Sequence, residues 1–480
     1  MHNALARTIL RGVNAPTFAL RSRRTVTPRG IEDAVVVVRD GIVAEVLPPR
    51  NPAARNAEDL GDLVLMPGLV DTHVHVNEPG RTEWEGFETA TRAAAAGGVT
   101  TIVDMPLNSV PATTTAAALR AKRAAAEGKC SVDVAMWGGV VPGNAGEIEA
   151  LAAEGVRGFK CFLVHSGVDE FPHVGKRDLS AAMPRIARLG LPLLVHAELP
   201  GPIEAASHAA MARDPRAYAS WLASRPRAAE CDAIAMMLGL CEETGCRVHV
   251  VHLAAADAVE MLRDARRRGL PVTAETCPHY LHFAAEEIAD GATPFKCAPP
   301  IRERENREWL WAALEEGLID LVASDHSPCP PEMKRLEAGD FFAAWGGIAS
   351  IELTLAATWT SARGRGFTPA DLARLMSGRP ALLARLEGSK GAIAPGRDAD
   401  LVAWDSAAEW IVDPAALHQR HKLTPYAGRT LTGRVLRTYV RGELVCRDDR
   451  MTGARPGRVL GAPEAPRPRG AAGSTRVPGR

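Results

Sequence analysis

Net charge and long apolar runs are both missing from this 480-residue sequence. The 57 Lys and Arg residues balance 57 Asp and Glu residues, so no charge field favours nucleic acid or a membrane surface as a partner. No apolar run approaches the roughly 18 to 20 residues of a membrane-spanning helix. Hydrophobic residues make up 46% and charged residues 24% of the chain, which is typical of a soluble globular protein with a large core and a second, smaller unit.

Paired cysteines are also missing, since the nine cysteines form no CxxC motif. The spacing of Cys241 and Cys246 suits neither a zinc ribbon nor a redox site, so we expect reduced, buried thiols in a cytoplasmic protein. Residues 1–31 carry six Arg and no acidic residue, which is compatible with a transit peptide. The stretch FALRSRRTVTP has the pattern of a strand and turn, however, and favours an unstructured extension of only about 15 residues.

From residue 63 onward, apolar β-rich runs alternate with Ala-rich helical patterns, several of which end at a glycine. This order predicts a parallel α/β architecture. Eight runs over residues 63–391 favour a (β/α)8 TIM barrel over a doubly wound sheet. The eight runs are LVLMPGLVDTHVH, VTTIVDMP, VDVAMWGGV, VRGFKCFLV, LPLLVHAE, RVHVVHL, PVTAETCPHYL and LIDLVASDHSP.

The two flanks of this region contain short strand-like pieces separated by hairpin-like turns such as RDG and RGE. We expect residues 17–62 and 392–450 to pair into one small β-sandwich domain built from both chain ends. Residues 453–480 are rich in Pro, Gly and Arg, which predicts a disordered tail.

Two histidines stand one residue apart at the end of the first run, in GLVDTHVHVNEPG. Alternate residues of a strand point to the same face, so His73 and His75 aim at one spot. That pair is a metal-ligand arrangement if other ligands converge on it. In a (β/α)8 barrel the carboxyl ends of all strands open onto one face. Four further groups at strand ends are therefore expected there: Lys160, His196, His252 and Asp325.

Lys160, within GFKCF, is unusual because an ammonium group repels cations. One interpretation is a lysine that extends its charge outward to solvent. The other is that a desolvated, neutral amine reacts with carbon dioxide, giving a carbamate with two oxygens and one negative charge that can bridge two metals. Its place in the strand order beside the other ligands favours carboxylation.

Asp325 has two available roles, as a metal ligand and as a proton shuttle. A carboxylate beside a metal-bound hydroxide can take up a proton and deliver it to a leaving nitrogen. The neighbouring His326 is a candidate substrate contact, although local satisfaction of a loop histidine explains it equally well.

Five segments in this order resemble the amidohydrolase superfamily, and within it the cyclic amidohydrolases, over roughly residues 17–450. They are PGLVDTHVH, GFKCF, VHAE, SDHSP and the late GAIAPGRDADLVAWD. The resemblance implies a hydrolase with two divalent metal ions. It places His73, His75, Lys160 and Asp325 on one metal and Lys160, His196 and His252 on the other. Zinc suits these ligands, although iron, cobalt, nickel or manganese would accept them too. It also implies a homotetramer acting on a small cyclic ureide.

The ring that is opened is predicted from other segments. NEPGRTEWEGFETATRAAAAGGVTT, DMPLNSVPATT and SDHSPCPPEMK resemble the allantoinases, which implies hydrolysis of allantoin to allantoate through a metal-bridging hydroxide, a step of purine catabolism. Dihydroorotases extend the first motif to HxHxR, where arginine binds a carboxylate, whereas Asn77 stands here. An amide suits a neutral ring, although Asn77 could also serve only to turn the loop.

Other candidate substrate contacts are Asn108, at the mouth after the second run, and Gly347, whose backbone could reach the ureide. Two alternatives stay open. The enzyme could open another ring, as a dihydropyrimidinase or hydantoinase, or the chain could be a non-catalytic scaffold. Loss of ligand residues would mark a scaffold, and all of the expected ligands are present.

Overall fold

The computed structural model describes residues 17–461, so the expected extension (residues 1–15) and residues 462–480 of the expected tail lie outside the described part. The strands are β1 (Phe18–Thr27), β2 (Gly30–Arg39), β3 (Ile42–Leu47), β4 (Glu58–Asp59), β5 (Val64–Pro67), β6 (Leu69–Val74), β7 (Val99–Asp104), β8 (Asp133–Met136), β9 (Gly138–Gly139), β10 (Phe159–Phe162), β11 (Pro192–His196), β12 (Arg247–Val250), β13 (Val272–Thr276), β14 (Leu321–Val322), β15 (Leu401–Ile411), β16 (Thr430–Val440), β17 (Glu443–Arg447) and β18 (Arg450–Met451).

The α-helices are α1 (Phe87–Ala96), α2 (Ala116–Ala126), α3 (Ile148–Ala153), α4 (Lys176–Arg188), α5 (Pro200–Met211), α6 (Tyr218–Ser224), α7 (Arg227–Thr244), α8 (Val259–Arg267), α9 (Pro278–His282), α10 (Arg304–Glu315), α11 (Thr354–Ala362), α12 (Pro369–Ala373) and α13 (Arg379–Leu383). Helices and strands alternate through most of the chain, so the prediction of an α/β protein is confirmed. Among residues 17–461 we find no helix with the length and apolar character needed to cross a bilayer.

The parallel strands follow the order of the sequence. Pairing runs from β6 through β7 to β8, and from β9 through β10, β11, β12 and β13 to β14. Trp137 alone separates β8 from β9, and Val74 of β6 forms a parallel bridge with His326, which follows β14. The backbone amide of His75 donates to the carbonyl oxygen of His326 at 2.9 Å. The first and last strands of the series are therefore neighbours, and their carboxyl ends lie together.

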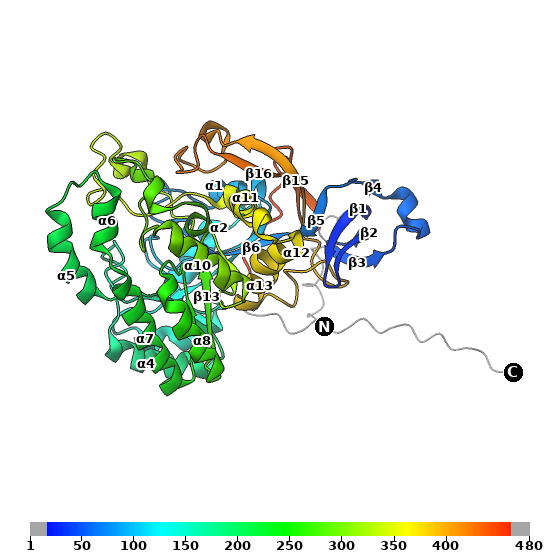
Figure 1. The fold of residues 1–480 in the computed structure, drawn as a ribbon. Helices are drawn as coiled ribbons and strands as arrows, with labels where there is room; N and C mark the ends of the chain where they lie inside the picture. The colour runs from blue at the N-terminus through cyan, green and yellow to red at the C-terminus, as the bar shows by residue number, and fades with distance from the viewer. Residues whose placement is uncertain (1–16, 462–480) are drawn as a thin grey trace, which may run out of the picture.

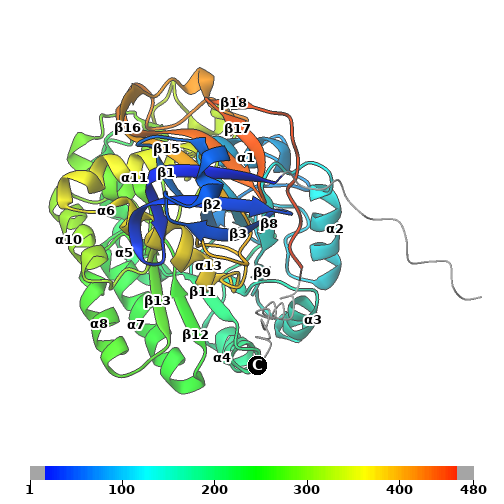
Figure 2. The same cartoon turned by 90° about the vertical axis from the view of Figure 1, so that its right-hand side faces the viewer.

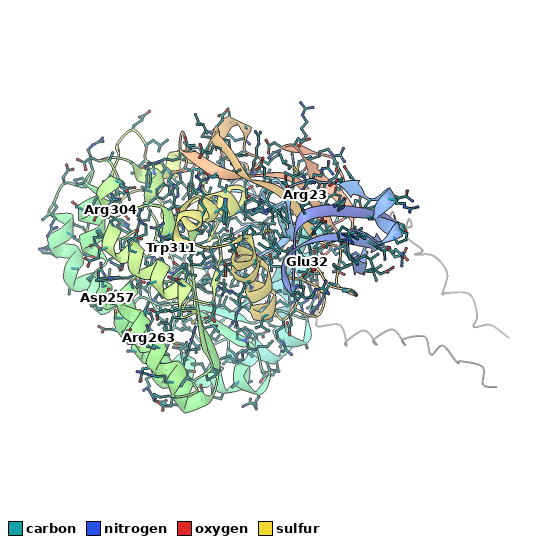
Figure 3. All side chains as sticks on the ribbon, turned by 45° about the vertical axis from the view of Figure 1, so that its right-hand side comes forward. Arg23, Glu32, Asp257, Arg263, Arg304 and Trp311 are labelled. Carbon is teal, nitrogen blue, oxygen red and sulfur yellow. The ribbon has the colours of Figure 1, made fainter. Side chains whose placement is uncertain are left out.

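The helices between these strands surround them, with α2, α3, α4, α7, α8 and α10 at the periphery of the view in Figure 2. Helix α8 shows why the helices lie outside the strands. Its buried residues recur about one helical turn apart, whereas Arg263 on its outer side pairs with Glu316 at 2.6 Å. Arg263 and Arg304 of α10 lie on this outer layer in Figure 3. The residues that α8 buries are Val259, Leu262 and Ala265.

A second sheet joins both flanks of the chain, in the order β18-β17-β16-β15-β5-β1-β2-β3, with β4 added beside β1. Strands β1 to β4 project to one side of the molecule in Figure 1, and Arg23 and Glu32 mark them in Figure 3. Strand β5 links the two flanks, since it pairs with β15 and with β1. The run LVLMPGLVDTHVH, expected to be one strand of the barrel, is therefore two strands in two sheets, β5 and β6.

Residues 453–461 differ from the prediction of a tail disordered from residue 453 onward. The amide of Val134 in β8 donates to the carbonyl of Arg458 at 2.9 Å, and the amide of Leu460 donates to the carbonyl of Val134 at 2.8 Å. The amide of Arg458 also donates to the buried carboxylate of Asp133. Pro and Gly content suggested disorder, but residues 458–460 lie along β8 and form an isolated parallel bridge between Val134 and Val459.

Candidate metal centre

The two histidines of the first parallel strand point toward one carboxylate. His73 lies in β6 and His75 directly follows it, and their Nε2 atoms lie 3.2 Å and 3.5 Å from Oδ1 of Asp325. All three side chains are buried, and one potential ligand atom of each lies within 4.8 Å of the others. Imidazole and carboxylate at this separation can hold a divalent metal ion.

The other nitrogen of each histidine faces a partner that fixes the orientation of the ring. Nδ1 of His73 lies 2.5 Å from Oε1 of Glu275, whose second oxygen lies 3.0 Å from Nε2 of His249. Nδ1 of His75 lies 3.5 Å from the side-chain nitrogen of Asn108. A carboxylate behind a histidine holds the opposite nitrogen toward the metal position. For His73 that nitrogen is Nε2, the one that faces Asp325.

Lys160, His196 and His252 come from the next part of the parallel sheet. His196 ends β11 and pairs in register with Phe162 of β10, two residues beyond Lys160. The rings of His196 and His252 have centroids 4.6 Å apart, and those of His73 and His252 are 5.3 Å apart. Both His252 Nδ1 and Lys160 Nζ are buried without a described hydrogen-bond partner. The ring contacts thus connect His73, His252 and His196 in a row, and Lys160 lies on the strand next to His196.

Burial sets the charges of these groups. It lowers the pKa of Lys160 to about 8, against the opposing charge of Glu275 and Asp325. Burial also lowers the pKa of His75 and His196, and it lowers that of His252 well below the usual range. These imidazoles are therefore neutral near pH 7, the form that binds metal.

Asp325 is held as an anion. Burial alone would raise its pKa, but His73, His75 and His252 lower it well below the usual range for a carboxyl group. Its Oδ1 also accepts a hydrogen bond from the hydroxyl of Ser327 at 2.9 Å. A buried carboxylate kept ionised can serve as a ligand or accept a proton.

Unusual backbone conformations cluster around the same residues. Positive φ angles occur at His252 (39°) and Asp325 (45°), which carry candidate ligands, and at Asn77 (66°) and Asn108 (67°), in the loops beside them. Such conformations are uncommon for residues other than glycine and collect at functional sites, where the surrounding fold enforces them. Here they direct the side chains of His252 and Asp325 into the metal centre.

The candidate ligands other than Lys160 line a cavity of about 250 Å³. Asn108 and Gly347, two of the expected substrate contacts, line it, and Asn108 Oδ1 is buried without a described partner. The remaining cavity residues include Phe162, His165, Trp221, Arg225, Lys296, Ser327 and Trp345. The cavity thus combines aromatic walls with polar groups near the metal centre, as sites for small ligands do.

The other two expected contacts do not line this cavity. The side-chain amide of Asn77 donates to the carbonyl of Pro328 at 3.4 Å, and its positive φ marks it as a turning residue of the loop. His326 is fully buried, and its Nδ1 accepts from the amides of Ser350 and Ile351 at 3.1 Å and 3.3 Å. His326 follows Asp325 in the sequence, but its side chain points in a different direction, so it does not line the cavity.

Several polar residues of the site were not expected from the sequence. Glu198 accepts from Nη1 of Arg225 at 2.5 Å and lies 2.8 Å from Nε2 of His196. Two buried lysines, Lys296 and Lys334, donate to backbone carbonyls of the cavity loop at residues 342–347. Glu198 could have been found from the VHAE motif, since it lies two residues beyond His196; nothing local marks the lysines.

The match of most of the chain to a known family agrees with this geometry. Residues 64–445 match the Amidohydrolase family, and the chain belongs to it.

Individual relatives are more specific than the family. The chain is 51% identical to an allantoinase of Streptomyces avermitilis, over 92% of this chain and 98% of that protein. It is 44% identical to an allantoinase of Arabidopsis thaliana, over 89% of this chain and 88% of that one. Among solved structures, L-hydantoinase (dihydropyrimidinase) from Arthrobacter aurescens superposes with a TM-score of 0.86 at 32% identity, covering 92% of this chain and all of that one.

Proposed function

We propose that this protein hydrolyses the hydantoin ring of allantoin to give allantoate, using a metal centre at the carboxyl ends of its parallel strands. The observation that carries the proposal is the buried set of ligands around one cavity: His73, His75 and Asp325 have ligand atoms within 4.8 Å of each other. Two relatives called allantoinases match nearly the full chain, which supports allantoin as the ring.

The ligand set fits a pair of divalent metal ions. We propose that His73, His75, Asp325 and Lys160 hold one ion, and that Lys160, His196 and His252 hold the other, with zinc as the preferred metal. The buried Nζ of Lys160, which has no described hydrogen-bond partner, supports this. Conversion of the amine by carbon dioxide to a carbamate would let this side chain bind the metals instead of remaining an unpaired buried group. The lowered pKa of about 8 supplies the neutral amine that the conversion needs.

The side chains of the cavity would act on the ring directly. Bound divalent metals would supply Lewis acidity toward a ring carbonyl and lower the pKa of water. Asp325 would accept the proton of the attacking water and deliver it to the ring nitrogen as the carbon–nitrogen bond breaks. Ser327 orients Asp325 through its hydroxyl. Asn108, with its unpartnered Oδ1 in the wall, would accept a hydrogen bond from an N–H group of the ring.

We also propose the finer architecture. The pairings from β6 to β14, with the bridge between Val74 and His326, support a closed (β/α)8 barrel over residues 63–391. The sheet shared by the chain ends supports a small β-sandwich domain from residues 17–62 and 392–450. We expect a homotetramer in the cytoplasm, acting on a small molecule and on neither nucleic acid nor membrane.

A hydantoinase is the second candidate, since the solved structure with a TM-score of 0.86 carries that name. The direct experiment incubates the purified, metal-loaded protein with allantoin and follows allantoate by chromatography. Formation of allantoate by the wild type, and its loss in Lys160→Ala protein of unchanged circular dichroism, is the expected result. No allantoate from fully loaded protein would contradict the proposal.

A further inference from the structure

Behind the metal centre lies a second group of metal-binding side chains that the proposed reaction does not use. Sγ of Cys277, a ring nitrogen of His279 and a carboxylate oxygen of Asp325 all lie within 4.8 Å of one another. All three residues are buried. Cys277 and His279 are absent from the residues that line the cavity, whereas Asp325 lines it. Asp325 is thus shared between the metal centre and this second group.

His279 gives independent evidence that the group is incomplete as described. Its side chain is fully buried, and neither Nδ1 nor Nε2 has a described hydrogen-bond partner. An imidazole whose two nitrogens are both buried and unsatisfied loses hydration without compensation. A cation bound to one nitrogen would remove that cost.

We propose that Cys277, His279 and Asp325 form an additional site for a thiophilic divalent cation of the zinc class, and that its occupation inhibits the enzyme. Thiolate, imidazole and carboxylate together select zinc, cobalt or cadmium over magnesium and calcium, which prefer oxygen ligands. Binding replaces the S–H bond of Cys277 with a sulfur–metal bond and releases one proton to solvent. The site differs chemically from the paired ions of the metal centre, none of whose ligands is a thiol.

Inhibition follows from the position of Asp325, and this step rests on the proposed function. A carboxylate that coordinates a cation has an oxygen lone pair engaged and a lower proton affinity, so it is a poorer proton acceptor and donor. Cys277 and His279 do not line the cavity, so a cation held by them and Asp325 would leave the other polar groups of the cavity free to bind substrate. Excess metal should therefore lower kcat more than it raises KM.

Cobalt tests the site without relying on activity. The full-length protein loaded with two equivalents of Co²⁺ is titrated with further Co²⁺, and near-ultraviolet absorption is recorded. We expect a thiolate-to-cobalt charge-transfer band that grows with a third equivalent. The band should vanish in Cys277→Ser. In His279→Gln it should require at least roughly tenfold more cobalt, in line with the usual cost of a lost metal contact. Cys130→Ser, which alters a buried thiol outside the cavity lining, is the matched control and should keep the band.

Zinc inhibition supplies the second measurement. Excess Zn²⁺ should lower kcat of the wild type and of Cys130→Ser, and Cys277→Ser should resist the same concentration by roughly tenfold or more. A wild type without a thiolate band at saturating cobalt, or a band that survives in Cys277→Ser, would overturn the site. If the band behaves as expected but no cyclic ureide is hydrolysed, the metal site stands and the proposed function fails.

Discussion

Nδ1 of His73 lies 2.5 Å from a carboxylate oxygen of Glu275, in a pair that is almost completely buried. Burial alone would raise the pKa of Glu275, but the charge of His73 and the hydrogen bonds to His249 and His73 lower it to about 2. Glu275 is therefore an anion that holds His73 with Nε2 toward Asp325. The orientation of this candidate ligand depends on a residue of β13, the strand that pairs with the last strand of the parallel series.

Replacing Glu275 with Gln should weaken the metal centre more than the fold. Gln keeps an acceptor for one histidine but removes the negative charge, so metal affinity should fall roughly 10–100-fold. Equilibrium dialysis against buffered zinc measures this. Glu243→Gln, a change at an exposed carboxylate, is the control. Equal zinc affinity in Glu275→Gln and wild type would show that Glu275 does not position His73.

Lys160→Ala should lose most activity and part of the bound metal, because the bridging group is gone. Short carboxylic acids such as formate, added to the variant, should restore some of both by supplying the missing oxygens. Metal analysis and allantoin turnover measure the two effects, with the exposed Lys176→Ala as the control. A variant that retains full metal content and activity would contradict carboxylation of Lys160.

Carboxylation should also depend on pH. The pKa of about 8 means that the neutral amine increases as pH rises through that value, and only the neutral amine reacts with carbon dioxide. Metal reloading of stripped protein at a fixed concentration of dissolved carbon dioxide should therefore be faster at pH 8.5 than at pH 6.5. Identical reloading in carbon-dioxide-free buffer would count against the carbamate.

Asp325→Asn should abolish turnover while the protein keeps its fold and much of its metal. The amide still offers an oxygen to a metal but cannot carry a proton, and general acid–base groups contribute roughly 10²–10⁴-fold in rate. Single-turnover kinetics and metal analysis test this. Asp257→Asn, at an exposed aspartate paired with Arg227, should behave as wild type. Near wild-type turnover in Asp325→Asn would remove Asp325 from the mechanism.

His282 should make the protein less stable in acid. Burial lowers its pKa to about 4 from the usual value of 6.5, so the unfolded chain binds the extra proton first. Its contribution to the free energy of unfolding is fully present above pH 6.5 and is lost as pH falls to about 4. The loss amounts to about 3 kcal/mol.

Thermal unfolding from pH 4.5 to 7.5 measures the contribution of His282. His282→Asn should be less stable at pH 7, because the contact of the ring with Ser361 at 3.0 Å is altered, but it should lose less stability in acid. The difference in stability between the two proteins at each pH removes the effect of the other titrating groups, which both proteins share. His208→Asn, at an exposed histidine of α5, should follow the wild type. Parallel pH profiles for His282→Asn and wild type would contradict a depressed pKa.

The candidate ligands could be selected from the sequence because each lies on or just after a strand in a regular series. The end of a strand can be predicted from the local sequence pattern. In a parallel series the carboxyl ends of all strands lie on the same side. Glu275, by contrast, is placed behind His73 by the fold alone. That contact joins residues 202 positions apart in the sequence, and no local pattern predicts a contact over such a separation.

The substrate contacts were less predictable for a related reason. Asn77 was expected to contact the substrate because it takes the position of the arginine in HxHxR, and His326 because it follows Asp325. Neither lines the cavity: Asn77 turns the loop, and the His326 ring accepts from backbone amides. Asn77 has a positive φ, and the sequence could predict only that it turns the loop. Residues 453–461 were expected to be disordered from composition, but composition does not reveal that Arg458 and Leu460 form hydrogen bonds with the backbone of β8.

The most direct test of the proposed function compares kcat/KM for allantoin, hydantoin, dihydrouracil and dihydroorotate on one preparation, with one metal and at one pH. Allantoin should be preferred, and dihydroorotate should be turned over poorly because Asn77 stands where the HxHxR motif has the arginine that binds its carboxylate. A hydantoin or dihydrouracil value roughly tenfold above that for allantoin, about 1.4 kcal/mol of transition-state preference, would contradict allantoin as the substrate and make the protein a hydantoinase or dihydropyrimidinase.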